Sequence, residues 1–359
     1  MLSIIDKYIS KLFIGFFLGG LAVFVVLFVA VDFMTNISTH NAPSQAIIQY
    51  YLLSAPSLVY QMLPVACLLG TIFTLSSLNR ANELVALFSS GMSLARISLP
   101  ILILVVLISS VSFWLNDRLV PIANQRKNYV YYVEILKKPG LYSTVKTDKI
   151  WYRSGNVLFN IKTLQAENET AQGLTMYYFD GAWKLIQMIT ADDVELKGAN
   201  WELHDGTVTL FSKESSVPMT QSFGSKTITV SEESADIQKG AQGSETLSVG
   251  ELKRFITRNR DAGLDTLRYE VDYHAKFSFA FAAFVMSFIG IPFSVTKQRG
   301  GGAAFNVGIT ILLAFGYWAA YSSGITLGRH GAIMPVIAVW LPNAIMVALS
   351  AIILFRLKK

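Results

Sequence analysis

The chain has 359 residues, of which 52% are hydrophobic and only 15% charged, and its formal net charge is +6. Soluble domains average about 25% charged residues, so this composition indicates an integral membrane protein that carries a soluble insert. Residues 117–272 contain 19 Lys and Arg against 21 Asp and Glu, so the positive charge lies in the rest of the chain. That distribution favours basic loops on the inner side of a membrane and argues against nucleic acid as a partner. The single cysteine, Cys67, excludes an internal disulfide and a metal site of the Cys/His type.

The N-terminal part of the chain predicts a surface helix and three spans. Residues 1–12 place their apolar side chains on one helical face, which is typical of a helix lying at a membrane surface before the chain turns inward. Residues 13–31 carry no charge and can cross a bilayer; the run is too long for a signal peptide and no cleavage site follows. Residues 34–55 lack Lys and Arg, as an outer hairpin would. The next spans are predicted at residues 56–78 and 98–116.

The segment 79–97, between the second and third spans, has the pattern of a short amphipathic helix. Asn79 or Ser77 can cap its start, and Gly91 can end it. Its apolar face would consist of Leu84, Leu87 and Phe88. Such a helix can simply return the chain to the bilayer, or it can dock into a groove of another protein. The local pattern alone favours the first use.

Residues 117–272 have the sequence pattern of a β-rich domain. Four short runs are rich in aromatic and β-branched residues and are separated by turn signals: 149–153, 157–161, 176–179 and 207–211. Strands without an intervening helical pattern predict a sandwich or jelly roll. Residues 231–248 have the composition of a flexible link, and residues 249–272 predict a charged helix that leads back to the bilayer.

Three further spans are predicted at residues 273–293, 304–323 and 334–355. Nine Lys or Arg residues fall in the short segments on one side: Lys7, Lys11, Arg80, Arg96, Lys297, Arg299, Arg356, Lys358 and Lys359. The short loops on the other side carry only Arg329. We therefore predict six transmembrane helices with both termini cytoplasmic and an inserted periplasmic all-β domain of jelly-roll-like fold. The domains would be 1–116, 117–272 and 273–359.

We find no constellation of catalytic residues. Residues 224–227 read Gly-Ser-Lys-Thr, but residue 219 is Met where a phosphate-binding loop needs its first Gly. The four histidines are scattered and form no i, i+4 pair with metal-ligand spacing. If this protein performs work, the energy must come from another chain.

Ionisable and aromatic residues near the span ends are the stronger signal, because charge near hydrocarbon is costly. Asp32, followed by Phe33, ends the first span, and Lys276 lies about one turn into the fourth. Each could reach to the interface or form part of a polar rim around a lipid-head-group site. Tyr317, Trp318 and Tyr321 could form an interfacial aromatic belt or line such a cavity, and the pattern favours the belt.

The layout resembles the LptF/LptG (YjgP/YjgQ) family of lipopolysaccharide export permeases over essentially the full chain. The most specific piece is Asn82–Leu87 followed by Ser90–Ser93, which is similar to the cytoplasmic coupling helix of that family. Lys276–Phe293 looks like the family's fourth span with a basic residue at its outer end. Trp340–Asn343 together with Ile5–Ile9 favours the LptG-type paralogue.

The resemblance implies one permease half of an ABC transporter that takes lipopolysaccharide from the inner membrane of a bacterium and passes it toward the outer membrane. Its expected partners are a paralogous permease, an LptB-type ATPase dimer that holds ATP and Mg²⁺, periplasmic bridge proteins of the LptC/LptA type, lipopolysaccharide and membrane lipid. This chain itself would bind no cofactor and catalyse no reaction.

The resemblance also implies roles for particular residues, and it reverses the preference for segment 79–97 toward docking. The expected ATPase-coupling residues are Arg80, Asn82, Glu83, Leu84, Leu87, Phe88 and Gly91. The expected substrate-binding residues are Asp32, Phe33, Lys276, Tyr317 and Tyr321. Some family members have basic residues where this chain has Asp32, so Lys276 is the better candidate for a substrate phosphate, aided by a partner chain or a divalent cation.

Two other classes of function stay open. A membrane-anchored sensor or envelope assembly factor would bind a ligand with its β domain and perform no transport. A membrane enzyme that acts on lipid ranks last, because the sequence offers no nucleophile or metal set.

Overall fold

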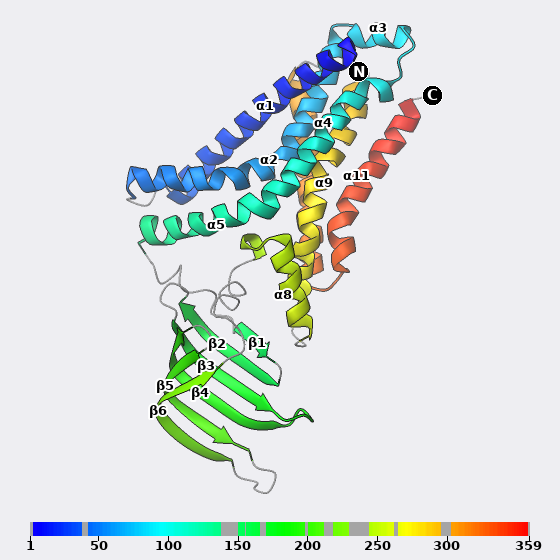
Figure 1. Cartoon of the computed structure of the whole chain (residues 1–359). Helices are drawn as coiled ribbons and strands as arrows, with labels where there is room; N and C mark the ends of the chain where they lie inside the picture. Colours follow the sequence, from blue (N-terminus) through cyan, green and yellow to red (C-terminus); the bar gives the residue numbers. More distant parts are fainter. Residues whose placement is uncertain are drawn as a thin grey trace. The chain divides into compact units, whose positions relative to one another are not determined.

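The computed structural model describes residues 3–37, 42–137, 150–154, 156–165, 170–197, 200–211, 218–229, 244–261, 265–295 and 303–357 (Figure 1). The chain forms two compact units. One consists of Met1–Lys127 with Leu267–Lys359 and is helical, and the other, Asn128–Thr266, contains the β-sheet. The helices on either side of the insert continue past residues 117 and 272, where we placed the domain limits.

The helical unit contains the six predicted spans. The helices and helical turns of the first half are α1 (Ile4–Asp32), η1 (Phe33–Ile37), α2 (Ser44–Arg80), α3 (Glu83–Ser89), α4 (Leu94–Trp114), η2 (Leu115–Leu119) and most of α5 (Val120–Tyr129). The last residues of α5 and the turn η3 (Val130–Ile135) already belong to the other unit. Those of the second half are α9 (Leu267–Val295), α10 (Ala303–Arg329) and α11 (Pro335–Leu357). Six of the described helical segments are long and apolar enough to cross a membrane, which confirms the six-span prediction by length and composition.

The structure corrects two predictions about the ends of the spans. The expected surface helix 1–12 and the first span form a single helix, α1, without a break between them. The expected outer hairpin 34–55 is largely helical, because α2 already begins at Ser44. With 37 residues, α2 is about 55 Å long, so it extends well beyond a hydrocarbon core of about 30 Å or crosses it at a tilt.

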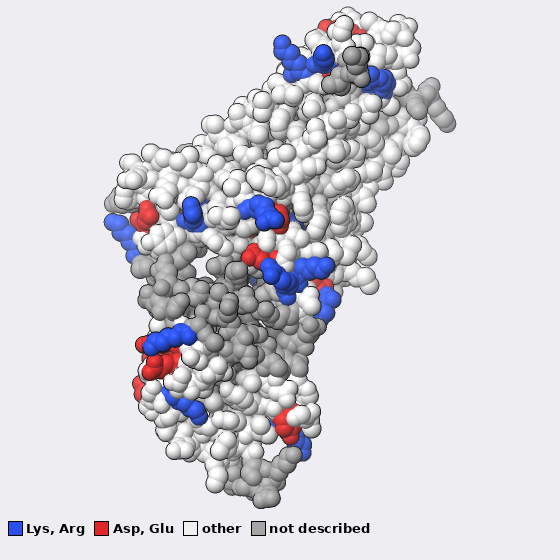
Figure 2. Space-filling model, in the orientation of Figure 1, with Lys and Arg blue, Asp and Glu red and all other residues white. Residues whose placement is uncertain are grey.

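The surface of the helical unit agrees with a membrane location. In Figure 2, charged side chains gather at the end that carries α3, and the face drawn between α3 and the level of α5 is almost free of them. Apolar side chains on α1 and α10 stay strongly exposed, including Val26, Leu312 and Phe315. A long apolar surface of this kind is covered by lipid or by another apolar chain.

The centre of the helical unit is formed by α2 and α9. In each of them 72% of the most apolar stretch is buried, against 17% in α1. Close packing depends on small residues: a Cβ atom at Gly70 of α2 would lie 3.1 Å from Phe13 Cε2 and 3.2 Å from Phe17 Cβ on α1. At Gly324 of α10 a Cβ atom would meet the backbone carbonyl oxygen of Ala338 on α11. These glycines let neighbouring helices approach at backbone distance.

The β unit is built on an antiparallel sheet. The strands are β1 (Ile150–Ser154), β2 (Val157–Gln165), β3 (Thr170–Phe179), β4 (Leu185–Lys197), β5 (Asn200–Leu210) and β6 (Met219–Thr229). In the described residues they form one curved sheet in the order β1-β2-β3-β4-β5-β6, so each strand pairs with its neighbour in sequence (Figure 1). The predicted β insert is therefore confirmed. Its arrangement is a meander, whereas the expected sandwich or jelly roll requires two packed sheets.

One face of this sheet carries its core. Trp201 and Phe159 are fully buried, and their rings meet edge to face with centroids 5.4 Å apart. Leu203, two residues after Trp201, is also fully buried, as the alternation of side chains along a strand requires. The Gly-Ser-Lys-Thr sequence at 224–227 lies inside β6, in extended conformation, and not in a phosphate-binding loop.

The chain leads back to the helical unit through the segment in which we predicted a link and a charged helix. Residues 231–243 of the expected link lie outside the described part of the chain. Ser244–Thr246 form a short 3₁₀ turn, η4, and α8 spans Val249–Asp261. A capping box starts α8, because the Ser248 backbone N–H donates to Glu251 Oε2 and the Glu251 N–H donates to Ser248 Oγ.

Candidate functional site

The predicted amphipathic helix between the second and third spans exists as α3 (Glu83–Ser89). Its expected caps are wrong, since Ser77 and Asn79 belong to α2. Asn82 precedes α3 instead, in left-handed conformation with φ of 60° and without a side-chain capping bond. Asn tolerates this conformation better than most residues. The connection between α2 and α3 is thus a sharp backbone turn at Asn82, without a side-chain cap.

Gly91 ends the segment as predicted. It has a φ of 86°, its N–H donates to the carbonyl of Phe88, and the N–H of Met92 donates to the carbonyl of Leu87. This pair of bonds is the Schellman arrangement, which requires a left-handed residue at the Gly91 position. The length of α3 is therefore defined by backbone hydrogen bonds.

The expected apolar face of α3 divides into an inner and an outer part. Leu84 is only 1% exposed and packs into the core of its own chain together with Ile97, and Leu87 is half-buried against the same core. Phe88 is exposed, and so is Val85, which we did not select from the sequence. Leu84 thus anchors α3, while the outer side chains are accessible to a partner. Arg80, Asn82 and Gly91 are exposed as well.

Two polar contacts join α3 and α4 to the first turns of α1. The Tyr8 hydroxyl donates to Glu83 Oε1 at 3.3 Å. Arg96, in the first turn of α4, donates from Nη1 to Asp6 Oδ1 at 2.6 Å and from Nη2 to Asp6 Oδ2 at 2.9 Å. The second contact is a bidentate ion pair, the strongest hydrogen-bonded geometry between these groups. Nothing local in the sequence connects residues so far apart.

At the other end of α1, Asp32 belongs to a local hydrogen-bond network. Its Oδ1 accepts from Asn36 Nδ2 at 2.7 Å, and its Oδ2 accepts from the hydroxyl of Tyr51 on α2 at 3.0 Å. The carboxylate is half-buried, and the neighbouring Phe33 is exposed. Asp32 therefore joins the ends of α1 and α2, and Phe33 lies on the surface.

The other predicted substrate-site residues lie inside the helical unit. Lys276 of α9 is only 7% exposed, and Tyr317 and Tyr321 of α10 are buried with their rings stacked, centroids 5.7 Å apart. The Tyr321 hydroxyl donates to the carbonyl of Ala275, directly before Lys276. The structure thus places Tyr321 against the backbone next to Lys276, with Tyr317 stacked on Tyr321. Both tyrosines are too buried in this chain to form an exposed aromatic belt.

An ion pair that we did not predict from the sequence lies near Lys276. Asp272, one turn earlier on α9, accepts from Arg329 Nε at 3.1 Å and from Arg329 Nη2 at 2.5 Å. The Asp272 side chain is 10% exposed and that of Arg329 38%, so the carboxylate is shielded from water while the guanidinium group stays partly accessible. Asp272 could have been found from the sequence by its spacing of four residues from Lys276, which places both on one helical face. Arg329, predicted as the lone basic residue of the outer loops, is the partner.

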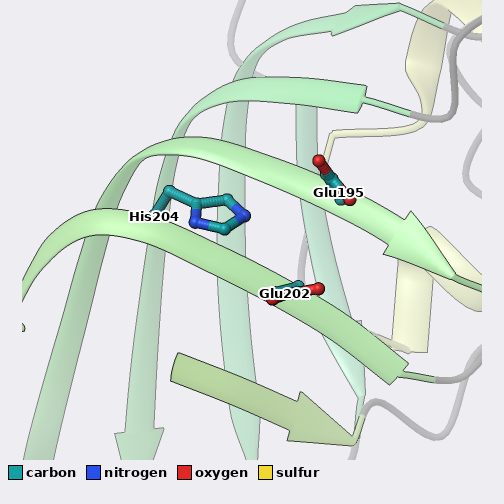
Figure 3. Close-up of side chains that lie close together, drawn as sticks. All are labelled: Glu195, Glu202 and His204. Atoms are coloured by element: carbon teal, nitrogen blue, oxygen red, sulfur yellow. The ribbon is translucent and has the colours of Figure 1, made fainter. Parts of the chain in front are cut away.

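A second polar group lies on the β unit. Glu195 of β4 and Glu202 of β5 are direct cross-strand partners, and His204 follows two residues after Glu202 on the same face (Figure 3). In the described part of the chain these are the residues that could together hold a metal ion, with ligand atoms within 4.8 Å of one another. However, Lys197 Nζ lies 2.9 Å from both carboxylates. A cation of the chain itself thus pairs with both glutamates.

The protonation of this group follows from the same contacts. The hydrogen bond from Lys197 lowers the pKa of the Glu202 carboxyl below its usual value of 4.5. The carboxylates of Glu202 and Glu195 raise the pKa of Lys197. Both shifts favour the charged forms of Glu202 and Lys197, which supports an ion-pair network over a metal site.

Comparison with known proteins adds the following. A model of the family described as "Lipopolysaccharide export system permease LptF/LptG" matches residues 7–356. The comparison with curated proteins gave no match.

Proposed function

Because the chain belongs to the LptF/LptG family of lipopolysaccharide export permeases, we propose that it forms one half of an ABC transporter that extracts lipopolysaccharide from the inner membrane and passes it to a periplasmic bridge. The family match over residues 7–356 carries the proposal, since it includes the six apolar helices, α3 and the β insert. The partner subunits are a paralogous permease and a pair of LptB-type ATPases that bind ATP and Mg²⁺. This chain supplies no ATPase site of its own.

The orientation that we propose places both termini and α3 in the cytoplasm and the β unit in the periplasm. The distribution of Lys and Arg supports it, because nine basic residues lie in the short segments of one side and only Arg329 on the other. In this orientation the β unit faces the LptC/LptA-type bridge.

The ATPase docks on the outer side of α3. Val85 and Phe88 offer exposed apolar surface, and Arg80 and Glu83 on either side of the turn offer charge of both signs. Leu84 fixes the helix to the transmembrane core, so α3 moves as a body when the ATPases close around ATP. Closure of the ATPases is thereby converted into movement of packed helices.

Lipopolysaccharide contacts the outer part of the helical unit. Lys276 is the candidate for a phosphate group, and Tyr317 and Tyr321 contribute through the Tyr321 bond to the backbone next to Lys276. Asp32 repels a phosphate directly, so it contributes there only through a divalent cation or through its bond to Tyr51. Phe33 offers an exposed ring to acyl chains.

The first test is to purify the chain from its native membrane in mild detergent and to identify everything bound to it by mass spectrometry. Recovery of a second six-span permease, a soluble ABC ATPase and lipopolysaccharide is the expected result. Recovery of the chain with periplasmic proteins alone contradicts the proposal. It would favour the alternative of a membrane-anchored sensor or envelope assembly factor, whose β unit binds a ligand without a transport cycle.

A further inference from the structure

The first turn of α1 is held by one carboxylate that performs two tasks. Asp6 accepts the Ser3 backbone N–H in a capping box, and its two oxygens also accept both Arg96 bonds. The Asp6 side chain is 8% exposed, so this ion pair is shielded on one side. We call the pair of Asp6 and Arg96 the clamp. Because Asp6 also caps the N-terminus of α1, the clamp joins the start of α1 directly to the start of α4.

The apolar residues next to the clamp reinforce it. Ile9 and Phe13, on the following turns of α1, are fully buried in the same cluster as Leu84 of α3 and Ile97 of α4. The bond from Tyr8 to Glu83 adds a polar contact between α1 and α3. The start of α1 is therefore joined to both α3 and α4. Figure 1 shows this end of α1 beside α3.

From the clamp, α1 continues without interruption to Asp32. Its 29 residues correspond to a rod of about 43 Å. Only 17% of its most apolar stretch is buried, compared with 72% in α2. α1 packs closely against α2 on one side, as at Gly70, but most of its remaining apolar surface is not covered within this chain. A helix held firmly at one end and packed on one side only can tilt more easily than α2, which is enclosed by its neighbours.

We propose that the clamp transmits displacement of α3 to α1, and that Asp6 and Arg96 are positioning residues of the transport reaction. The inference rests on the proposed function, since it requires an ATPase on α3. When the ATPase moves α3, the start of α4 and the clamped start of α1 move with it, and the far end of α1 at Asp32 is displaced. The Tyr8 hydroxyl steadies Glu83 until the ATPase engages that carboxylate.

The test uses the complex purified from native membranes and reconstituted into liposomes that contain lipopolysaccharide. Asp6→Asn keeps an oxygen for the cap of α1 but removes the charge that pairs with Arg96, and Arg96→Gln removes the other partner. Lys7→Gln is the matched control, because Lys7 is exposed and one residue from Asp6. ATP hydrolysis and lipopolysaccharide release are measured in the same sample.

The expected result is that both clamp variants retain the ATPase and hydrolyse ATP, while lipopolysaccharide released per ATP falls about fivefold or more, as for a typical loss of coupling between sites. Because the two residues act as one unit, the double variant should be no worse than either single variant. Lys7→Gln should match the wild type. Unchanged release per ATP in both clamp variants overturns the inference, as does an additive double variant.

A spectroscopic distance measurement shows whether a clamp variant has lost the movement transmitted to α1 or has only become less well folded. Spin labels at Met34→Cys and Met334→Cys, both at exposed positions, report the distance from the far end of α1 to the start of α11. In otherwise wild-type protein, ATP should shift this distance. Arg96→Gln should abolish the shift, and Lys7→Gln should keep it. A shift that persists in Arg96→Gln overturns the inference.

If Arg96→Gln is poorly folded, Asp6→Asn serves for the same measurement. Wild-type complex that neither binds an ATPase nor releases lipopolysaccharide would instead overturn the proposed function. The two failures are thus distinguishable.

Discussion

Tyr317 of α10 and Asn343 of α11 are joined by a hydrogen bond of 2.9 Å between two side chains that are almost completely buried. The Asn343 amide continues the network to α9, since Nδ2 donates to the carbonyl and to the hydroxyl of Ser278 at 3.0 and 2.9 Å. Three helices are connected by this network. In an apolar surrounding, where no water can replace a lost partner, such bonds hold the helices in one register.

Replacement of Tyr317 by Phe should lower the stability of the purified protein by about 1 kcal/mol, because the Asn343 oxygen loses its donor. Asn343→Ala should cost more, since it also leaves the carbonyl of Ser278 without this donor. Thermal unfolding of both variants in the same detergent checks the order. Equal midpoints for Asn343→Ala and the wild type would contradict it.

The second prediction concerns the close approach of α10 and α11. Gly324→Ala should destabilise the protein by about 1–3 kcal/mol, the usual range for overpacking, because the new Cβ meets the carbonyl oxygen of Ala338. Gly316→Ala is the matched control on the same helix, since a Cβ at Gly316 meets nothing within 4 Å. Thermal midpoints of the two variants should therefore differ, with only Gly324→Ala reduced.

The third prediction separates anchoring from docking on α3. Leu84→Ala should loosen the helix, with a cost of about 2–5 kcal/mol for a buried Leu, and hydrogen exchange of the α3 amides should become faster. Val85→Ala should leave exchange unchanged and weaken association with the ATPase, because Val85 is 54% exposed. Faster exchange in the Val85 variant would contradict this assignment of the two faces.

The fourth prediction is a pH dependence of the β unit. The lowered pKa of Glu202 gives a stabilisation that is present above its unfolded value of 4.5 and is lost as the pH falls through the folded pKa. The raised pKa of Lys197 gives a stabilisation present below 10.5 and lost as the pH rises through its own folded pKa. The Lys197 side chain is 61% exposed and that of Glu202 35%, so solvent screens the pair and the effect should be small.

Carboxyl carbon shifts of isotopically labelled glutamate in the full chain provide the measurement. In Lys197→Ala the pKa of Glu202 should rise toward or above 4.5, because Glu202 loses the hydrogen bond and the positive charge of Lys197 and still faces Glu195 across the strands. An unchanged Glu202 titration in this variant would show that Lys197 is not the cause of the lowered pKa.

The spans and the β insert could be predicted because long apolar runs and short aromatic strands leave local patterns. Two strands escaped prediction. β4 contains Asp192, Asp193 and Glu195, which are unfavourable in strands, and the side chains of β6 are mostly small, polar and exposed. Their place in the sheet depends on pairing with β5, which is a long-range effect.

The candidate sites show the same limit. The existence of α3 and its end at Gly91 followed from local spacing, but the burial of Leu84 and the exposure of Val85 depend on which helices surround α3. The bond between Asp6 and Arg96 joins residues 90 positions apart, and neither carries a local sign of the other. Contacts of this kind are set by helix packing, which a single sequence does not reveal.

The backbone turns at Asn82 and Gly91 have a consequence for mutational scanning. Since α3 begins and ends by backbone conformation, exchanges of its outward side chains change neither its length nor its register. A loss of affinity for the ATPase measured for such an exchange can then be interpreted as lost interface energy, because the helix keeps its length and register. Asn82 and Gly91 are the exceptions, because a β-branched residue at either position would be strained and would reshape the helix itself.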